Sequence, residues 1–371
     1  MRIIVERKGR RHNIQLLKGK ETVSRLSIVD LRMRIGRAVV RMGDIAGLHT
    51  DPGHRMKGYA RKVMEYSAQY MYEQGYDISI LFGIRGFYRR FGYAPCLYEH
   101  KAIIATREAE EVARRKYKTR PLTKADIPAI LEIYQENNRE RTGTVLRPRR
   151  YWKGFRKGTR WGHPPLVLVV LDRKAQIIGY GAYDDSPTEL NVVEVGAKSD
   201  DVFGTLLKKF ALLAVKMRTA EINFFLPQDH PFAYYLQRFD LRSETFYRGD
   251  GRGVGRIINQ ERLLEKMRKE FERRLATSVL AAWGGTLEIK TDLGTSSILL
   301  DQGRVALSEE KTKARGRLQL PQWALLQAML GYRDLRTILH EPGVKATGEA
   351  LQMSDALFPK GAPYMWFADY F

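Results

Sequence analysis

One succession of segments occurs twice along the chain, and this repeat constrains the fold more than any other feature. An apolar strand, a loop, an amphipathic helix and a second short strand occupy residues 38–82, and the same order returns over residues 191–226. In the first copy the spacing of Val63, Met64 and Met71 predicts a helix over Met56–Glu73 with one buried face. The pattern predicts two copies of one α/β unit.

The length and the pattern together predict three domains. With 371 residues, the chain exceeds what a single hydrophobic core usually supports. The two domains that contain these copies cover residues 1–107 and 108–260, and the second begins with a charged stretch at Glu108. Residues 261–371 begin with another amphipathic helix, followed by two strands and a helix at Pro321–Leu330. We expect an α/β (α+β) fold with a separate α+β domain at the C-terminal end.

Cysteine content and hydropathy narrow the class of protein. The single cysteine, Cys96, excludes a disulfide framework and a cysteine-based zinc cluster, and we expect no metal cofactor. The N-terminal residues carry charges where a signal peptide needs an apolar core. The apolar run Leu166–Leu171 is far shorter than the roughly 20 residues that span a bilayer. The sequence predicts a cytoplasmic protein that has no membrane partner.

The charge balance allows two interpretations. The 64 lysines and arginines against 42 acidic residues give a net charge of +22, which favours polyanions as partners. In residues 147–161, basic side chains alternate with aromatic ones, a pattern that suits stacking on nucleic acid. The basic residues are spread along the whole chain, however, and the aromatics of this run can equally pack inward. Nucleic-acid binding therefore stays an alternative function, and we favour a basic solvated surface.

The stretch most informative about chemistry joins a strand to the helix of the first copy. Within Gly47–Arg61, the loop has the pattern Arg55-x-x-Gly58-x-Ala60. Backbone N–H groups at a helix N-terminus lack internal partners and lie at the positive end of the helix dipole. Small residues let a pyrophosphate approach that backbone closely, and the basic side chains add positive charge. The loop alone is a weak signal, because a turn with basic surface residues has the same composition.

A second motif follows the next strand: Gly86-Phe-Tyr-Arg-Arg-Phe-Gly-Tyr-Ala-Pro95. Together, the two motifs resemble the hallmarks of the GNAT (Gcn5-related N-acetyltransferase) superfamily, which implies tandem GNAT acyl-CoA N-acyltransferase folds and acetyl-CoA as co-substrate. By this resemblance, the cofactor lies between two strands that splay apart. The implied cofactor-binding residues are Leu48, His49 and Thr50 for the pantetheine, Arg55, Met56, Lys57, Gly58, Tyr59, Ala60 and Arg61 for the pyrophosphate, and Gly83 and Ile84 on the other side.

The resemblance also assigns roles in catalysis. Tyr88 matches the family's general acid, and a phenol with an ordinary pKa near 10 suits protonation of a departing thiolate. Alternatively, Tyr88 is an aromatic side chain that packs beside Phe87 and Phe91 and has no catalytic role. Tyr93 is expected to be structural. His49 and His54 are expected to contact the cofactor rather than to act as bases.

The second copy keeps the scaffold but loses the site. Its loop, Val195-Gly-Ala-Lys-Ser-Asp-Asp-Val-Phe-Gly204, has Asp200 and Asp201 where a pyrophosphate needs positive charge. Residues 231–241 echo the tyrosine motif only faintly. We expect no CoA binding in this copy.

The chain resembles the Eis (enhanced intracellular survival) family over nearly its whole length. It shares the order of one copy with a cofactor site, one degenerate copy without it, and a final helix-and-sheet domain. Two short motifs carry this resemblance most specifically: Val145-Leu-Arg-Pro148 and Trp283-Gly-Gly-Thr-Leu-Glu-Ile289. The resemblance implies a primary-amine acceptor such as an aminoglycoside or a lysine side chain, a homo-oligomer (a hexamer) and a sterol-carrier-like third domain. It also implies that the terminal carboxylate of Phe371 is the general base. The alternatives are that the apolar tail completes a core and that the third domain carries an apolar ligand.

The chain departs from these families in one respect that bears on the acceptor. A GNAT unit normally begins with a strand and two helices that form one wall of the acceptor site. Here strands follow one another almost from Met1, so that wall is expected to be shortened.

Overall fold

A computed structural model describes residues 1–111, 115–152, 154–160, 163–185, 188–249, 252–308 and 313–370. The chain forms two compact units, the first made of residues 1–97 and 248–363 and the second of residues 98–247 and 364–370. Three mixed sheets among the described residues confirm the predicted α/β fold class. The division at residues 107 and 260 stays a prediction. Among the described residues, every helix is too short or too polar to cross a membrane.

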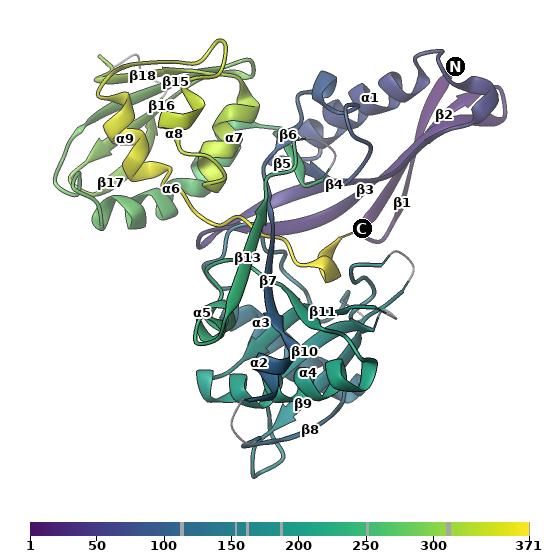
Figure 1. The fold of residues 1–371 in the computed structure, drawn as a ribbon. Coiled ribbons are helices and arrows are strands. Elements are labelled where there is room, and N and C mark those ends of the chain that lie inside the picture. The colour runs from purple at the N-terminus through teal and green to yellow at the C-terminus, as the bar shows by residue number, and fades with distance from the viewer. Residues whose placement is uncertain are drawn as a thin grey trace. The chain divides into compact units, whose positions relative to one another are not determined.

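The first unit begins with a seven-stranded sheet of order β1-β2-β3-β4-β5-β14-β6 (Figure 1). Helix α1 (Tyr59–Glu73) packs against β2, β3 and β4. As expected, strands come before this helix. In the fully described stretch 1–58 the only helical element is the short 3-10 turn Pro52–His54. The strands are β1 (Arg2–Lys8), β2 (Arg11–Lys18), β3 (Glu21–Ile35), β4 (Ala38–Thr50), β5 (Ile78–Leu81), β14 (Val254–Ile257) and β6 (Ala94–Pro95).

The apolar face predicted for α1 is the one that packs on this sheet. Val63, Met64 and Met71 are buried, and burying each such side chain stabilises the fold by about 1.5–3 kcal/mol. Gly43 on β4 lets α1 approach closely, because a Cβ there would lie 2.4 Å from the Met71 sulfur. The absence of a side chain at Gly43 therefore allows α1 to pack closely on β4.

A second sheet of the first unit has the order β17-β16-β15-β18-β19. Helix α6 (Gln260–Ala276) packs against β17 and also against β4. Glu270 of α6 is buried and accepts hydrogen bonds from the Arg273 and Arg274 side chains and from the Arg37 backbone. The remaining elements are β15 (Gly285–Thr291), β16 (Gly294–Asp301), β17 (Arg304–Ser308), β18 (Gly316–Gln319), β19 (Lys345–Gly348), α7 (Gln322–Leu330), α8 (Leu335–Ile338) and α9 (Ala350–Leu357).

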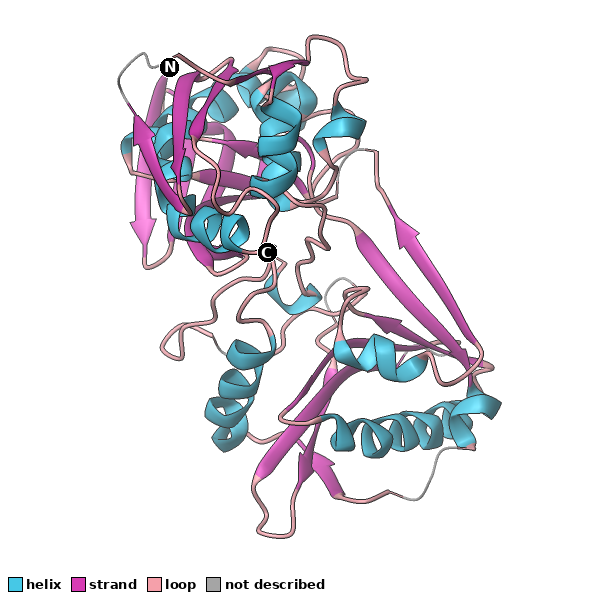
Figure 2. Ribbon diagram, turned by 90° about the vertical axis from the view of Figure 1, so that its left-hand side faces the viewer, coloured by secondary structure: helices cyan, strands magenta, loops and turns pink. Residues whose placement is uncertain are grey.

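The second unit has a seven-stranded sheet of order β13-β7-β12-β11-β10-β9-β8, with helix α4 (Phe203–Met217) along one face (Figure 2). Gly181 makes room for this packing, since a Cβ there would lie 2.5 Å from the Phe210 ring. The neighbouring Tyr180 and Ala182 face the other way and pack with α3 (Ile127–Asn137). The remaining elements are β7 (Glu99–Ala105), β8 (Lys118–Pro121), β9 (Leu166–Leu171), β10 (Ile177–Asp185), β11 (Leu190–Ala197), β12 (Glu221–Phe225), β13 (Leu241–Phe246), α2 (Thr106–Glu110) and α5 (Pro231–Leu236).

The two predicted copies are visible as parallel strand–helix–strand units, β4-α1-β5 and β11-α4-β12. The strands of the first unit are not all consecutive in the chain. β7 pairs with β12 and β13 of the second unit, whereas β14, which follows that unit in the sequence, pairs with β5 and β6 of the first. Neither unit is therefore a continuous piece of chain.

Candidate active site

The candidate site begins where β4 and β5 part. The two strands pair in parallel from Met42 with Ile78 to Ile45 with Leu81. β5 ends there, whereas β4 continues to Thr50 along β3. The register of β3 and β4 shifts just beyond this point, between Arg25 and Ser27, and Gly47 has a left-handed φ of 61°. Such a bulge bends a strand, so the end of β4 turns away from the line of β5.

A cavity of about 670 Å³ lies at this separation. It is bounded by the end of β4, the loop after it, the first turn of α1 and the segment that follows β5. Its lining residues are Leu48, His49, Thr50, His54, Arg55, Met56, Gly58, Tyr59, Ala60, Arg61, Ile84, Phe87, Arg90 and Phe91. All the predicted cofactor residues except Lys57 and Gly83 therefore meet at one cavity.

The two remaining residues have other contacts. The Lys57 ammonium donates a hydrogen bond to the Gly53 carbonyl at 2.9 Å. Gly83 lies against the Tyr88 ring, where a Cβ would be 2.5 Å from a ring carbon. Gly83 thus determines how closely Tyr88 approaches the chain that leaves β5.

The loop at one end of the cavity has the backbone of an anion site. Met56 and Gly58 both have left-handed φ values, 62° and 75°, and Gly58 immediately precedes α1. No described side chain caps the N-terminus of α1, so its first N–H groups are available to a ligand. Arg55 and Arg61 also line the cavity. Helix dipole, backbone donors and two guanidinium groups together suit a pyrophosphate.

His49, at the end of β4, and His54, in the loop that follows, each pair with a carboxylate. His49 Nε2 lies 3.0 Å from an Asp51 oxygen, and His54 Nε2 lies 3.1 Å from a Glu21 oxygen. Both histidines line the cavity, and their role as cofactor contacts stays a prediction.

Tyr88 is buried next to the cavity, with 5% of its surface exposed. Its phenol accepts a hydrogen bond from the backbone of Ile84, which is itself a lining residue. Burial raises the pKa of the Tyr88 phenol, and the Ile84 bond opposes part of that rise. The phenol is therefore neutral at physiological pH and can donate a proton. Phe87 packs edge-on against the ring at 5.1 Å.

Tyr93 makes a different kind of contact. It is fully buried and donates a hydrogen bond to the Ser79 hydroxyl at 2.8 Å. Burial raises the pKa of Tyr93 to about 12. This internal bond agrees with the structural role expected for Tyr93.

Sequence reasoning missed three lining residues of the tyrosine motif: Phe87, Arg90 and Phe91. The motif was recognised, but only Tyr88 was assigned a role. Arg90 and Phe91 lie in a 3-10 turn over Arg89–Phe91, and Phe87 just before it lines the same cavity. Their spacing of three and four residues is the signal that identifies them.

The corresponding place in the second unit is acidic. A cavity of about 430 Å³ is lined there by Asp200, Asp201, Gly204, Pro231, Tyr234, Tyr235 and Arg238. The Lys116 ammonium and the Tyr117 hydroxyl donate to Asp201, and these bonds hold the pKa of its carboxyl well below the usual range. An ionised carboxylate at this helix start disfavours a phosphate.

Two further predictions concern other parts of the chain. The terminal carboxylate of Phe371, the predicted general base, lies outside the described residues. In the run 147–161, Arg147 and Phe155 are buried, so these two side chains pack inward instead of facing a nucleic acid.

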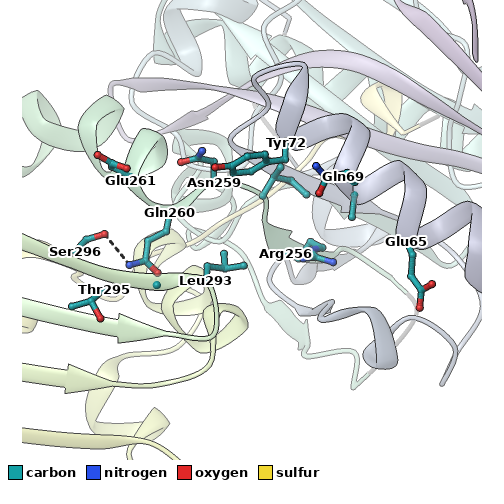
Figure 3. A pocket seen from close by; sticks show the side chains of 13 residues that line it. Glu65, Gln69, Tyr72, Arg256, Asn259, Gln260, Glu261, Leu293, Thr295 and Ser296 are labelled. Atoms are coloured by element: carbon teal, nitrogen blue, oxygen red, sulfur yellow. Dashed lines mark hydrogen bonds between the residues drawn. The ribbon is translucent and has the colours of Figure 1, made fainter.

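Another cavity of the first unit, of about 420 Å³, lies between α1 and the turn that joins β15 to β16 (Figure 3). Its walls are mainly polar, and Gln260 donates to the Ser296 hydroxyl at 2.9 Å (Figure 3). None of the predicted cofactor residues is among its described lining residues. Arg256 links the two cavities, because it lines this one and donates to the Phe91 carbonyl at 2.7 Å.

Comparison with known proteins agrees with this geometry. Residues 4–96 match the family described as acetyltransferase (GNAT) domain. A probable N-acyltransferase from Enterococcus faecalis has a similar structure, with 16% identity, a TM-score of 0.78, and coverage of 98% of this chain and 90% of that one. A GCN5-related N-acetyltransferase from Kribbella flavida has 19% identity and a TM-score of 0.74, with 97% and 87% covered.

Eis1 from Mycobacterium abscessus is similar too, with 16% identity, a TM-score of 0.67, and coverage of 97% of this chain and 90% of that one. No curated protein sequence matches the chain. Residues 4–96 thus match a GNAT acetyltransferase domain, and nearly the whole chain shares its fold with solved structures described as GCN5-related N-acetyltransferases.

Proposed function

We propose that the protein is an Eis-like N-acetyltransferase that transfers the acetyl group of acetyl-CoA to a primary amine. The cavity between the separated strands β4 and β5 supports this most strongly, because it unites an anion-binding helix start with a buried, neutral phenol nearby. Acetyl-CoA fits the donor set: Arg55, Arg61 and the N–H groups at the start of α1 suit its pyrophosphate. The half-buried strand end Leu48–Thr50 suits its pantetheine arm.

In the proposed reaction, a neutral amine attacks the thioester carbonyl carbon, and the carbon–sulfur bond breaks. A backbone N–H near Leu48 stabilises the negative charge that develops on the carbonyl oxygen. Tyr88 donates its proton to the departing thiolate. The terminal carboxylate of Phe371, as in the resemblance to the Eis family, takes the proton that the amine loses. A carboxylate with a low ordinary pKa acts as such a base when desolvation raises its pKa or when it works through a water molecule.

The remainder of the proposal concerns assembly. The five-stranded sheet with α6 to α9 supports a sterol-carrier-like fold for residues from 261 onwards. On the resemblance we also propose a homo-hexamer in the cytoplasm. The hydrodynamic mass of the purified protein tests the hexamer directly.

Binding of acetyl-CoA is expected to raise the melting temperature. A ligand present at about 100 times its Kd, bound only by the native state, adds about 2.7 kcal/mol of stability. For a unit of this size that corresponds to about 5–10 °C. Differential scanning fluorimetry measures the shift, with adenosine as a control that lacks the pyrophosphate and pantetheine. An unchanged melting temperature at saturating acetyl-CoA contradicts the proposed function.

Reversal of charge at Arg61 is expected to weaken the binding of acetyl-CoA specifically. Arg61→Glu replaces a cation with an anion beside the pyrophosphate, and a charged hydrogen bond contributes about 1.5–3 kcal/mol. We expect KM for acetyl-CoA to rise by about tenfold to a hundredfold. Arg173→Glu, in the exposed turn between β9 and β10, makes the same charge change away from the cavity and is expected to leave KM within about twofold. Equal effects of both variants contradict a local role for Arg61.

The acceptor is identified by release of free CoA in the presence of four primary amines. These are an aminoglycoside, a lysine-containing peptide, a polyamine and a small metabolic amine. The amine with the highest kcat/KM defines the acceptor class.

A further inference from the structure

The turn that follows Tyr88 is held by side chains from distant parts of the first unit. Arg256 Nη1 donates to the Phe91 carbonyl at 2.7 Å. Gln322 Nε2 donates to the next carbonyl, that of Gly92, at 2.5 Å. Gln322 belongs to α7 and is 1% exposed. Two successive carbonyls of the tyrosine motif thus bind side chains that are 165 and 230 residues away in the sequence.

The Gln322 side chain uses both ends of its amide. Its Oε1 accepts a hydrogen bond from the Ile257 backbone N–H at 2.7 Å, while its Nε2 donates to Gly92. The Gln322 backbone N–H donates to an Asp292 carboxylate oxygen at 2.6 Å, so the first residue of α7 is anchored as well. Gly92 makes room for the amide, because it has a left-handed φ of 77° and a Cβ there would lie 2.8 Å from Nε2.

The Gln322 amide lies where β6 and β14 part. Their antiparallel pairing ends with Ala94 opposite Gly255. Two residues further in this register, Gly92 would come opposite Ile257. Instead, the Gln322 amide bridges these two residues and supplies the acceptor and the donor that the backbone of a facing strand would supply. The amide therefore determines where the 3-10 turn of the tyrosine motif joins β6.

Backbone hydrogen bonds connect this junction to Tyr88. The Gly92 N–H donates to the Arg89 carbonyl at 3.0 Å. The Phe91 N–H donates to the Tyr88 carbonyl at 2.9 Å, and the Tyr93 N–H donates to the same carbonyl at 3.4 Å. Because the whole turn is only three residues long, a displacement of Gly92 moves the backbone that carries the phenol.

We propose that Gln322 is a positioning residue for Tyr88: its amide, held between the tyrosine motif and β14, sets where the phenol lies beside the cofactor cavity. This rests on the proposed function, in which Tyr88 protonates the departing thiolate. A misplacement of about 1 Å can lower a rate by about two orders of magnitude. The domain predicted to begin at residue 261 therefore takes part in acetyl transfer through the first residue of α7.

The test is a double-mutant cycle in the full-length protein. Gln322→Met keeps the length and the helix preference of the side chain but removes the amide. We expect kcat, measured with the amine that performs best in the panel above, to fall by about tenfold to a hundredfold. In the Tyr88→Phe background, the same change should cause less than about a twofold further loss, because the phenol that Gln322 positions is already absent. A purely structural effect lowers kcat equally in both backgrounds.

Hydrogen exchange provides a second measurement, which needs no substrate. The backbone N–H groups of residues 91–93 all donate within the turn, and their exchange should be about tenfold faster or more in Gln322→Met. Should Gln322→Met fail to fold, Gln322→Asn takes its place with the same expectations. Its amide is one methylene shorter and cannot bridge both backbone partners.

Gln327→Met is the matched control. Gln327 also belongs to α7, is 3% exposed and donates to the Pro95 carbonyl at 2.7 Å. The variant removes a buried bond of the same kind, but at β6, beyond the turn that carries Tyr88. We expect both methionine variants to lower the melting temperature by about 2–8 °C. In Gln327→Met, kcat measured well below that temperature should stay within about twofold, and exchange of residues 91–93 should not change.

Three results overturn the positioning role. One is an equal loss of kcat from Gln322→Met in the wild-type and Tyr88→Phe backgrounds. Another is unchanged exchange of residues 91–93 in Gln322→Met. The third is a loss of kcat in Gln327→Met as large as that in Gln322→Met, which indicates general weakening of the first unit. Full activity of Tyr88→Phe is a different failure, because it shows that the acid in the proposed function is wrong and overturns the inference with it.

Discussion

Replacing Tyr88 with phenylalanine is expected to lower kcat by about two to four orders of magnitude while acetyl-CoA binding persists. General acid catalysis contributes a factor of this size, and the variant removes only the proton that the departing thiolate needs. Steady-state kinetics and the thermal shift by acetyl-CoA separate the two quantities. Because burial raises the pKa of the phenol, any alkaline decline in kcat caused by Tyr88 should lie above pH 10.

Tyr93→Phe is the matched control. It removes a phenol from the same motif and breaks the hydrogen bond to Ser79, at a cost in stability of about 1 kcal/mol. We expect its kcat to stay within about threefold. If both variants lose activity in proportion to their loss of stability, Tyr88 is a packed aromatic, as its alternative interpretation holds.

One alanine added after Phe371 is expected to lower kcat by about a hundredfold or more. The addition moves the terminal carboxylate by up to about 3.5 Å, and general base catalysis contributes about two to four orders of magnitude. KM for acetyl-CoA should change little. One alanine inserted after the exposed Met1 gives a chain of equal length whose carboxylate is unmoved. Full activity of the C-terminally extended chain removes the carboxylate from the mechanism.

Much of the candidate site follows from local sequence. The basic glycine loop and the tyrosine motif lie on either side of one cavity, because both follow strands that are parallel neighbours. The helix predicted from Met56 begins at Tyr59, since Met56 and Gly58 have left-handed backbones that no helix accommodates. Boundaries of this kind depend on single φ angles, which residue spacing does not reveal.

Contacts between distant segments were not predictable in this way. The alternation of basic and aromatic residues in 147–161 suggested a surface for nucleic acid, yet Arg147 is buried. Its carboxylate partners, Glu194 and Asp369, are 47 and 222 residues away in the chain. No local pattern distinguishes an arginine that will be buried by such partners from one that stays in water.

The late position of β14 in the chain has a consequence for synthesis of the protein. β5 needs β14 as its neighbour on one side, but the whole second unit except its C-terminal segment is translated between them. At about 5–20 residues per second, β14 leaves the ribosome roughly 10–35 s after β5. During that interval β5 has an open edge, the kind of surface to which another nascent chain can add a strand. Translation speed through the second unit therefore sets how long this edge of the first unit is exposed to aggregation.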